Sequence, residues 1–209
     1  MLAMALIGAA AGRTDPVERP VPVPAADDVV VQVGACGVCR TDLHVVDGEL
    51  PDVPIPIVPG HQAVGTIAQV GAEVRGLAVG DRVGVPWLAS TCGTCTYCES
   101  GRENLCRSAR FTGYHLDGGF AEFVRAKAEY VLRLPDGASD AQLAPLLCAG
   151  LIGFRAYRMA GTGSRLGFYG FGAAAHILAQ IAKADARDVY AFTSPGDQEA
   201  QSFARRLGA

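Results

Sequence analysis

The sequence predicts a mixed β and α/β fold, in which a region of short strands precedes a β-α-β segment. Residues 64–74 and 80–85 alternate apolar and small side chains between glycines, as short antiparallel strands and turns do. Residues 164–169 read as a strand, and Gly170-x-Gly172-x-x-Ala175 then opens a helix of small residues over 174–184. We therefore expect a partly closed β-barrel first and an α/β region second.

Composition limits the possible partners. A chain of 209 residues, half of them hydrophobic, can form one large domain or one and a part. Its net charge of -3 argues against a nucleic-acid or anionic-membrane surface. The apolar residues 1–8 lack a basic flank and are too short to span a bilayer, so they read as a first strand. We expect a cytoplasmic protein with neither nucleic acid nor membrane as partner, in which thiols bind metal.

The first elements lead to a run of reactive side chains. Residues 29–33 read as a strand and residues 34–39 as a turn out of it. Residues 40–44 read as a polar helix start, with Thr41 or Asp42 as its cap. Four prolines then predict an extended loop over residues 51–59, which leads to His61.

Four cysteines, spaced C-x2-C-x2-C-x7-C, form the most specific motif. Thiolates at this spacing wrap a tetrahedral zinc ion, and four protein ligands make the site closed and structural. Two disulfides or an iron–sulfur cluster are the alternatives, and disulfides fit a cytosolic chain poorly. The ligands are Cys92, Cys95, Cys98 and Cys106.

A second metal set is more scattered. Residues 121–125 and 130–134 read as strands, and an apolar helix opened by Ser139 or Asp140 runs through Leu147, with Cys148 near its end. One histidine and two cysteines with a vacant fourth position form a ligand set of catalytic zinc sites. Cys39, His61 and Cys148 could supply it, but ligands so far apart are not a motif.

Taken together, the run from Cys39 to His44, Gly60-His61, the cysteine lobe, Cys148 and the glycine turn resemble the zinc-dependent medium-chain alcohol dehydrogenases, in order and in spacing. The resemblance covers essentially the whole chain, although members usually run past its C-terminus. It implies a GroES-like catalytic domain over residues 1–150 with a zinc lobe over 88–110. Residues 151–209 would then begin a Rossmann domain, left incomplete.

The resemblance also implies roles for single residues. Two zinc ions per chain are expected, a catalytic one on Cys39, His61 and Cys148 and a structural one on the lobe. In the family, Thr41 holds the alcohol hydroxyl and passes its proton to His44, whose imidazole titrates near neutrality.

Neighbouring positions complete the implied site. Asp42 would orient His61 on the metal, and Arg40 would contact the cofactor pyrophosphate. Trp87 reads equally as a core aromatic or as a wall of the substrate pocket. Many relatives carry Glu where this chain has Gln62, so a role for that carboxylate in ligand exchange is in doubt.

The cofactor expectation comes from the glycine turn. A strand before it and a helix after it are the context of a dinucleotide fingerprint, in which Gly170, Gly172 and Ala175 admit the pyrophosphate. The next strand, residues 188–193, ends at Thr193-Ser194-Pro195-Gly196, where NAD enzymes carry the carboxylate that holds a ribose hydroxyl. Asp197 is a possible substitute. This leaves NADP open, and NAD is favoured because no arginine directly follows the strand.

The function expected is reversible oxidation of a primary or secondary alcohol, with hydride transfer to NAD(P). The chain supplies about two of the six strands of a doubly wound domain, which predicts a fragment or a short product. An inactive fragment and a zinc-stabilised binding module without turnover are therefore the alternatives. Full-length relatives are expected to be homo-oligomers.

Overall fold

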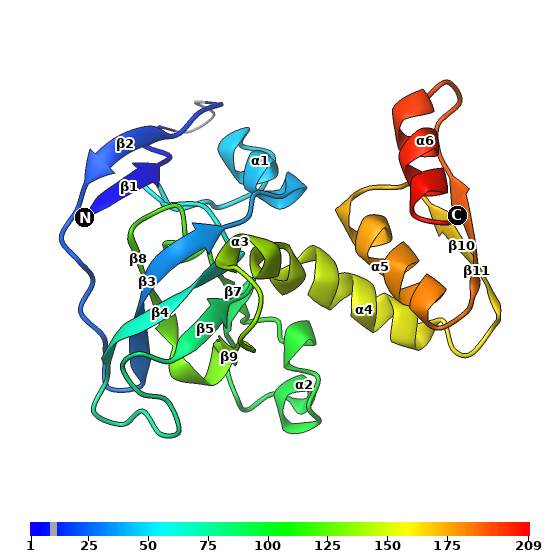
Figure 1. Cartoon of the computed structure of the whole chain (residues 1–209). Coiled ribbons are helices and arrows are strands. Elements are labelled where there is room, and N and C mark those ends of the chain that lie inside the picture. The colour runs from blue at the N-terminus through cyan, green and yellow to red at the C-terminus, as the bar shows by residue number, and fades with distance from the viewer. Residues whose placement is uncertain (9–11) are drawn as a thin grey trace. The chain divides into compact units, whose positions relative to one another are not determined.

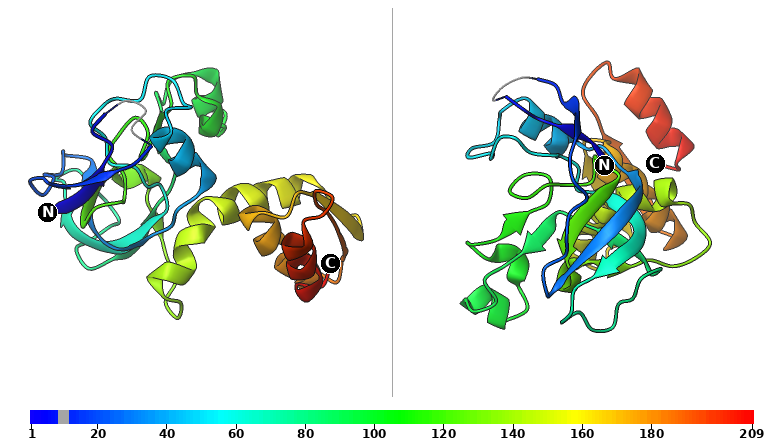
Figure 2. Two further views of the ribbon diagram at one scale, coloured as in Figure 1. Left: turned by 90° about the horizontal axis from the view of Figure 1, so that it is seen from above. Right: turned by 90° about the vertical axis from the view of Figure 1, so that its left-hand side faces the viewer.

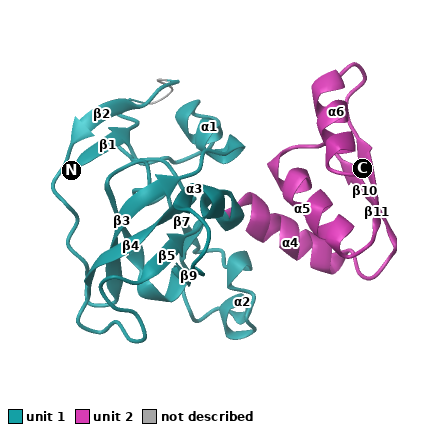
Figure 3. Cartoon of the chain, viewed as in Figure 1, with its two compact units in different colours: residues 1–147 teal, residues 148–209 magenta. Residues whose placement is uncertain are grey.

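A computed structural model describes residues 1–8 and 12–209. The chain divides into two compact units, residues 1–147 and 148–209 (Figure 3). The first contains most of the strands, and the second contains two parallel strands with three helices (Figure 1).

The first unit is built mainly of short strands. They are β1 (Leu2–Ala5), β2 (Asp15–Glu18), β3 (Asp28–Cys36), β4 (Ala63–Val70), β5 (Arg82–Val85), β6 (Leu88–Ser90), β7 (Arg110–Phe111), β8 (Phe123–Lys127) and β9 (Leu132–Arg133). Five of them form an antiparallel sheet in the order β8-β3-β4-β5-β9, and β1-β2 and β6-β7 are separate pairs. The five-stranded order has two ends, so the described strands do not close a barrel. The mixed β and α/β class is confirmed.

The inner strand β3 is buried on both faces over residues 28–31. Val29 and Val31 point to the same side of β3 and are 0% exposed. They pack with Val83, Val85 and neighbours into the largest cluster of this unit. Burial of apolar side chains is the dominant favourable term in folding, so this cluster stabilises the sheet that carries the site.

The turn expected over residues 34–39 begins later than predicted, because β3 continues to Cys36. Gly34 lies at a register shift inside the strand and not in a turn. A Cβ built on Gly34 would lie 2.0 Å from Asp140 Oδ2. This glycine therefore allows a close approach of two segments, a requirement that local sequence does not reveal.

The helical elements of the first unit are short. They are α1 (Arg40–Val46), α2 (Thr96–Glu99), α3 (Asp140–Leu143) and the 3₁₀ turns η1 (Glu103–Leu105), η2 (Ala128–Tyr130) and η3 (Ala144–Leu147). Ser139 caps α3, as one of the two predicted caps. The continuous helix expected through Leu147 is wrong: α3 makes one turn and tightens into η3. Pro145 has no N–H to donate to Ala141, which prevents a further α-helical bond.

The second unit is a β-α-β segment with flanking helices. It comprises α4 (Ala149–Met159), β10 (Arg165–Tyr169), α5 (Ala173–Ala184), β11 (Asp188–Phe192) and α6 (Gln198–Arg206). The two strands are parallel, with Arg165 opposite Asp188. Leu178, Ala179 and Val189 form part of its buried cluster. The other face of the strands exposes Tyr169, Tyr190 and Phe192.

The segment containing α2 and η1 lies at the edge of the first unit, away from β1 and β2 in every view (Figures 1 and 2). This segment carries the cysteine motif, which we call the cysteine lobe (residues 92–106). Its position shows that the motif is presented outside the sheet core.

Candidate functional site

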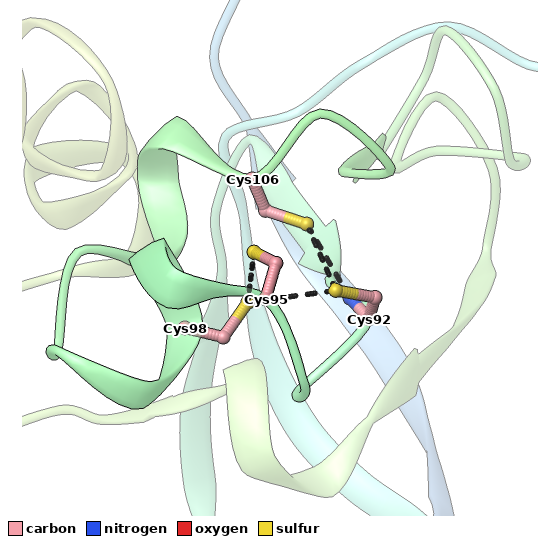
Figure 4. Close-up of side chains that lie close together, drawn as sticks. All are labelled: Cys92, Cys95, Cys98 and Cys106. Carbon is pink, nitrogen blue, oxygen red and sulfur yellow. Dashed lines mark hydrogen bonds between the residues drawn. The ribbon is translucent and has the colours of Figure 1, made fainter.

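The cysteine lobe brings its four thiols together (Figure 4). The sulfur atoms of Cys95 and Cys98, and those of Cys92 and Cys106, are 3.5 Å apart, and Cys92 and Cys98 are 3.9 Å apart. A disulfide would require about 2.05 Å. Sulfurs on a tetrahedron around zinc, each at about 2.3 Å from the ion, lie about 3.8 Å apart. The donor set and its spacing fit zinc.

Hydrogen bonds in the lobe stabilise the thiolates of Cys92 and Cys98, whereas the pKa of Cys95 is raised to about 11. A backbone hydrogen bond from Thr94 and a contact with Cys106 lower the pKa of Cys92 to about 6. The Thr91 hydroxyl, which lies 3.4 Å from Cys98 Sγ, lowers the pKa of Cys98. Because metals bind thiolates and not thiols, this environment favours a metal.

The second group of ligands is assembled from distant residues. Cys39 Sγ and His61 Nε2 are 3.2 Å apart. A ligand atom of Cys148 joins them, so that all three lie within 4.8 Å of one another. Cys148 is bonded directly to Leu147, which is 3% exposed and packs in a cluster of the first unit. Two sulfurs and an imidazole at this spacing fit the three-ligand set of a zinc site.

Asp42 holds two of these ligands in place. Its side chain is buried and accepts hydrogen bonds from the backbone N–H of Cys39 (2.8 Å) and of Gly60 (3.1 Å) and from His61 Nδ1 (2.9 Å). An ionised carboxylate can only accept, so His61 carries its proton on Nδ1. Nε2 then has its lone pair available for a metal. This is the arrangement that outer carboxylates provide in metal sites.

The same carboxylate changes the titration of His61. Burial lowers the pKa of His61, but the hydrogen bonds to Asp42 and Cys39 outweigh burial and raise the pKa to about 9. In the metal-free site a proton therefore competes with metal for Nε2.

Cys39 is itself the N-cap of α1, which corrects the predicted cap at Thr41 or Asp42. Cys39 Sγ accepts the backbone N–H of Thr41 at 3.3 Å, and the carboxylate of Asp42 accepts the N–H of Cys39. These reciprocal bonds form a capping box. The prediction failed because cysteine is not among the usual capping residues. The helix start therefore fixes the position of Cys39.

The predicted relay residues lie on α1. Thr41 lies one turn before His44, whose side chain is 35% exposed. His44 contacts a residue that the sequence analysis missed, Glu49. Arg40 is exposed at the first position of the helix.

Trp87 packs beside the histidine of the assembled site. Its ring meets that of His61 edge to face, with 4.9 Å between centroids. Trp87 also stacks on Phe111 at 4.8 Å and on Tyr114 at 5.9 Å. These two aromatics were not predicted from the sequence, because they are far from Trp87 in the chain and carry no motif. The imidazole is thus held by an aromatic cluster as well as by Asp42.

Gln62 follows His61 and is 2% exposed. Its Nε2 has no hydrogen-bond partner among the described residues. A Cβ built on Gly37, two residues before Cys39, would lie 3.1 Å from Gln62 Oε1. A neutral amide, and not a carboxylate, therefore lies against the segment that leads to Cys39.

The glycine turn of the second unit joins β10 to α5. Gly170 has a φ of 85° and donates its N–H to Phe192 O at 2.8 Å. Gly172 is the N-cap of α5, and Ala175 lies in the first turn of that helix. Nothing lies within 4 Å of a Cβ built on either glycine. The helix start is open to a ligand, as a dinucleotide turn requires. Asp197 caps α6, accepting the N–H of Ala200 at 3.0 Å.

In the part of the chain that the structure describes, no helix has the length and apolar character needed to cross a membrane.

Comparisons with known proteins place the chain among the alcohol dehydrogenases. The family model of the alcohol dehydrogenase GroES-like domain matches residues 25–136. The chain is 48% identical to the probable alcohol dehydrogenase AdhA of Mycobacterium tuberculosis (strain CDC 1551 / Oshkosh) over 206 residues, covering 94% of this chain and 59% of that protein. It is 45% identical to an alcohol dehydrogenase of Geobacillus stearothermophilus, covering 87% of this chain and 54% of that one. The chain thus spans just over half the length of these relatives.

Solved structures match the whole chain. The alcohol dehydrogenase of Aeropyrum pernix aligns with a TM-score of 0.86 at 34% identity, covering 100% of this chain and 63% of that one. A cobalt- and zinc-bound thermostable alcohol dehydrogenase from Pyrobaculum aerophilum gives a TM-score of 0.87 at 28% identity, covering 100% and 64%.

Proposed function

Because the chain belongs to the zinc-type medium-chain alcohol dehydrogenase family, we propose that it catalyses the NAD(P)-dependent oxidation of an alcohol to an aldehyde or ketone, and the reverse reaction. The observation that carries this proposal is the convergence of Cys39, His61 and Cys148, with Asp42 fixing His61. A closed structural site has no use for a three-ligand set of this kind.

The two ligand sets would hold two zinc ions per chain. The lobe residues Cys92, Cys95, Cys98 and Cys106 would bind a structural ion. Cys39 Sγ, His61 Nε2 and Cys148 Sγ would hold a catalytic ion, which as a Lewis acid lowers the pKa of an alcohol hydroxyl. The protein's own contribution is to fix the imidazole in the tautomer that can bind metal.

Thr41 and His44 would handle the proton that the alcohol loses. The Thr41 hydroxyl binds the substrate hydroxyl and passes a proton to His44, which lies one helical turn further and is partly exposed to solvent. Imidazole is suited to this because it accepts and releases protons near neutral pH.

A nicotinamide dinucleotide would supply the hydride acceptor. Gly170, Gly172 and Ala175 at the start of α5 would receive its pyrophosphate, with Arg40 as a cationic contact. NAD is favoured over NADP because no arginine directly follows β11. The carboxylate of Asp197, the possible ribose ligand, is engaged as the cap of α6. We assign residues 1–150 to the catalytic domain and 151–209 to the start of the cofactor domain.

The substrate class would be a small alcohol or aldehyde, with Trp87 limiting the pocket from its position beside His61. We propose the cytoplasm as its location, where thiols stay reduced, and a homo-oligomeric assembly for the whole protein.

Metal analysis of the purified chain, combined with an assay of alcohol-dependent NAD(P)H formation, tests the proposal. We expect two zinc ions per chain. Cys39→Ala should lose one ion and all turnover, while the matched variant Cys98→Ala should lose the lobe ion instead. Two retained ions with full turnover in Cys39→Ala would contradict the ligand assignment. One zinc ion in the unsubstituted chain would favour the binding module, and two without nicotinamide binding would favour an inactive fragment.

A further inference from the structure

The C-terminus of α1 places Glu49 beside His44. Asp47 is the C-cap, with its N–H donating to Leu43 O at 2.8 Å. Gly48 then takes a φ of 72°, which reverses the chain, and the N–H of Glu49 donates to His44 O at 2.9 Å. This is a glycine-dependent helix end, which returns the chain to the last turn. The backbone of Glu49 is therefore tied to the residue that its side chain contacts.

The side chains of the two residues are also in direct contact, Glu49 Oε2 with His44 Nδ1. An ionised carboxylate is only an acceptor, so the neutral ring of His44 must carry its proton on Nδ1. Nε2 is then an acceptor. In water a neutral imidazole carries its proton mainly on Nε2, so the contact reverses the ordinary preference.

We propose that Glu49 is a positioning residue for His44: its carboxylate holds the ring in the tautomer whose Nε2 can receive a proton. The role of that tautomer rests on the proposed alcohol oxidation. As the alcohol gives its proton to the Thr41 oxygen, the Thr41 O–H bond breaks and an Nε2–H bond forms on His44. The imidazolium then loses the Nε2 proton to water, and the ring returns to its starting tautomer with Nδ1–H still held by Glu49.

The chain already uses this device once. Asp42 accepts the proton of His61 Nδ1 at 2.9 Å and leaves Nε2 toward Cys39 Sγ. Glu49 and His44 repeat the pairing at the surface, where the side chain of Glu49 is 56% exposed. Asp42 leaves Nε2 of His61 available to bind metal, whereas Glu49 leaves Nε2 of His44 available to accept a proton.

His115 provides an internal control. Its Nδ1 accepts the backbone N–H of Phe111 at 3.2 Å, so its neutral ring must carry the proton on Nε2. The two histidines should therefore show opposite tautomers in the same protein. Both can be read from long-range ¹H–¹⁵N correlation spectra of the zinc-loaded chain, at a pH where the rings are neutral.

We expect His44 to be protonated on Nδ1 and His115 on Nε2. Glu49→Ala should move the His44 proton to Nε2 and leave His115 unchanged. Glu49→Gln, whose amide oxygen still accepts, should retain Nδ1–H. Backbone amide spectra of both variants verify the fold.

A His44 ring protonated on Nε2 in the unsubstituted chain, or on Nδ1 in folded Glu49→Ala, would overturn the proposal. If Glu49→Ala fails to fold, the unsubstituted chain and Glu49→Gln decide it. The measurement requires no turnover, so it can fail while alcohol oxidation is observed, and it can succeed where none is found.

Discussion

The two candidate metal centres of this chain are built in opposite ways. The lobe takes four ligands from residues 92–106, with Cys92 exposed and only Cys106 buried. The assembled site takes its ligands from residues 39, 61 and 148, and its His61 and Asp42 are 1% and 2% exposed. The lobe needs only short turns to aim its sulfurs. The assembled site needs the fold to deliver its ligands, so it should be sensitive to changes in the core.

The largest loss of stability is expected for Asp42→Ala, which tests whether the assembled site depends on the fold. In Asp42→Ala, the N–H groups of Cys39 and Gly60 and the Nδ1–H of His61 lose their acceptor in a buried place. At about 1–3 kcal/mol for each unsatisfied group, we expect unfolding to become easier by about 4 kcal/mol. Metal analysis should show loss of the assembled-site zinc, with the lobe ion retained. Denaturant unfolding measures the stability.

The control for this variant is Asp27→Ala, which removes an exposed ion pair with Lys127. It should change stability far less than Asp42→Ala, because an exposed ion pair is screened by solvent. If Asp42→Ala kept both zinc ions and a stability close to that of Asp27→Ala, the assembled site would not depend on its buried carboxylate.

Alanine substitution of one glycine in each site should give a smaller loss of stability and allows a direct comparison of the two sites. Gly60 precedes His61 with a φ of 99°, and a Cβ there would lie 2.6 Å from Phe120 Cδ1 and 2.8 Å from Phe120 N. Gly93 in the lobe has a φ of 73° and nothing within 4 Å of its built Cβ. Gly93→Ala should cost only the backbone strain, about 1 kcal/mol, whereas Gly60→Ala adds overpacking and should cost about 3 kcal/mol. Equal costs in thermal or denaturant unfolding would show that crowding does not distinguish the two sites.

The smallest expected effect is the pH dependence of the metal-free chain. The folded pKa of His61, about 9, lies above its ordinary value of 6.5. The folded state therefore binds this proton more tightly than the unfolded state does. The resulting stabilisation is fully present below pH 6.5 and is lost as the pH rises through 9. From pH 7 to pH 8, we expect stability to fall by about 1 kcal/mol.

Denaturant unfolding of the chelator-treated chain and of His61→Gln measures this contribution as the difference between the two pH dependences. That subtraction removes the titration of the lobe cysteines. A difference that grew with pH would mean that the proton on His61 destabilises the folded chain.

Local sequence accounts for the elements that depend on neighbouring residues. The β-α-β segment was predictable because its glycine turn, its strands and the helix between them are contiguous. The Ser139 cap was predictable because Ser139 and Gln142 have the spacing of a capping box. The break at Pro145 was also encoded locally but was outweighed by the apolar run around it.

The tertiary structure decided the features that bring distant residues together. The length of β3, the cap at Cys39 and the contact of Trp87 with Phe111 and Tyr114 each depend on a partner that no short window contains. Glu49 was overlooked although it lies five residues from His44, because a positive φ at Gly48 is needed to turn its side chain back.

By itself, the sequence determined which side chains are available as metal ligands, and it determined the lobe, because short turns between close cysteines restrict where their sulfurs can point. Only the tertiary structure decided that Cys39 and His61 meet, since that contact requires α1 and the segment before β4 to be fixed by one buried carboxylate. The physical reason is entropic: closing a short loop costs little and can be specified locally, whereas joining distant segments must be sustained by burial and hydrogen bonds of the whole unit.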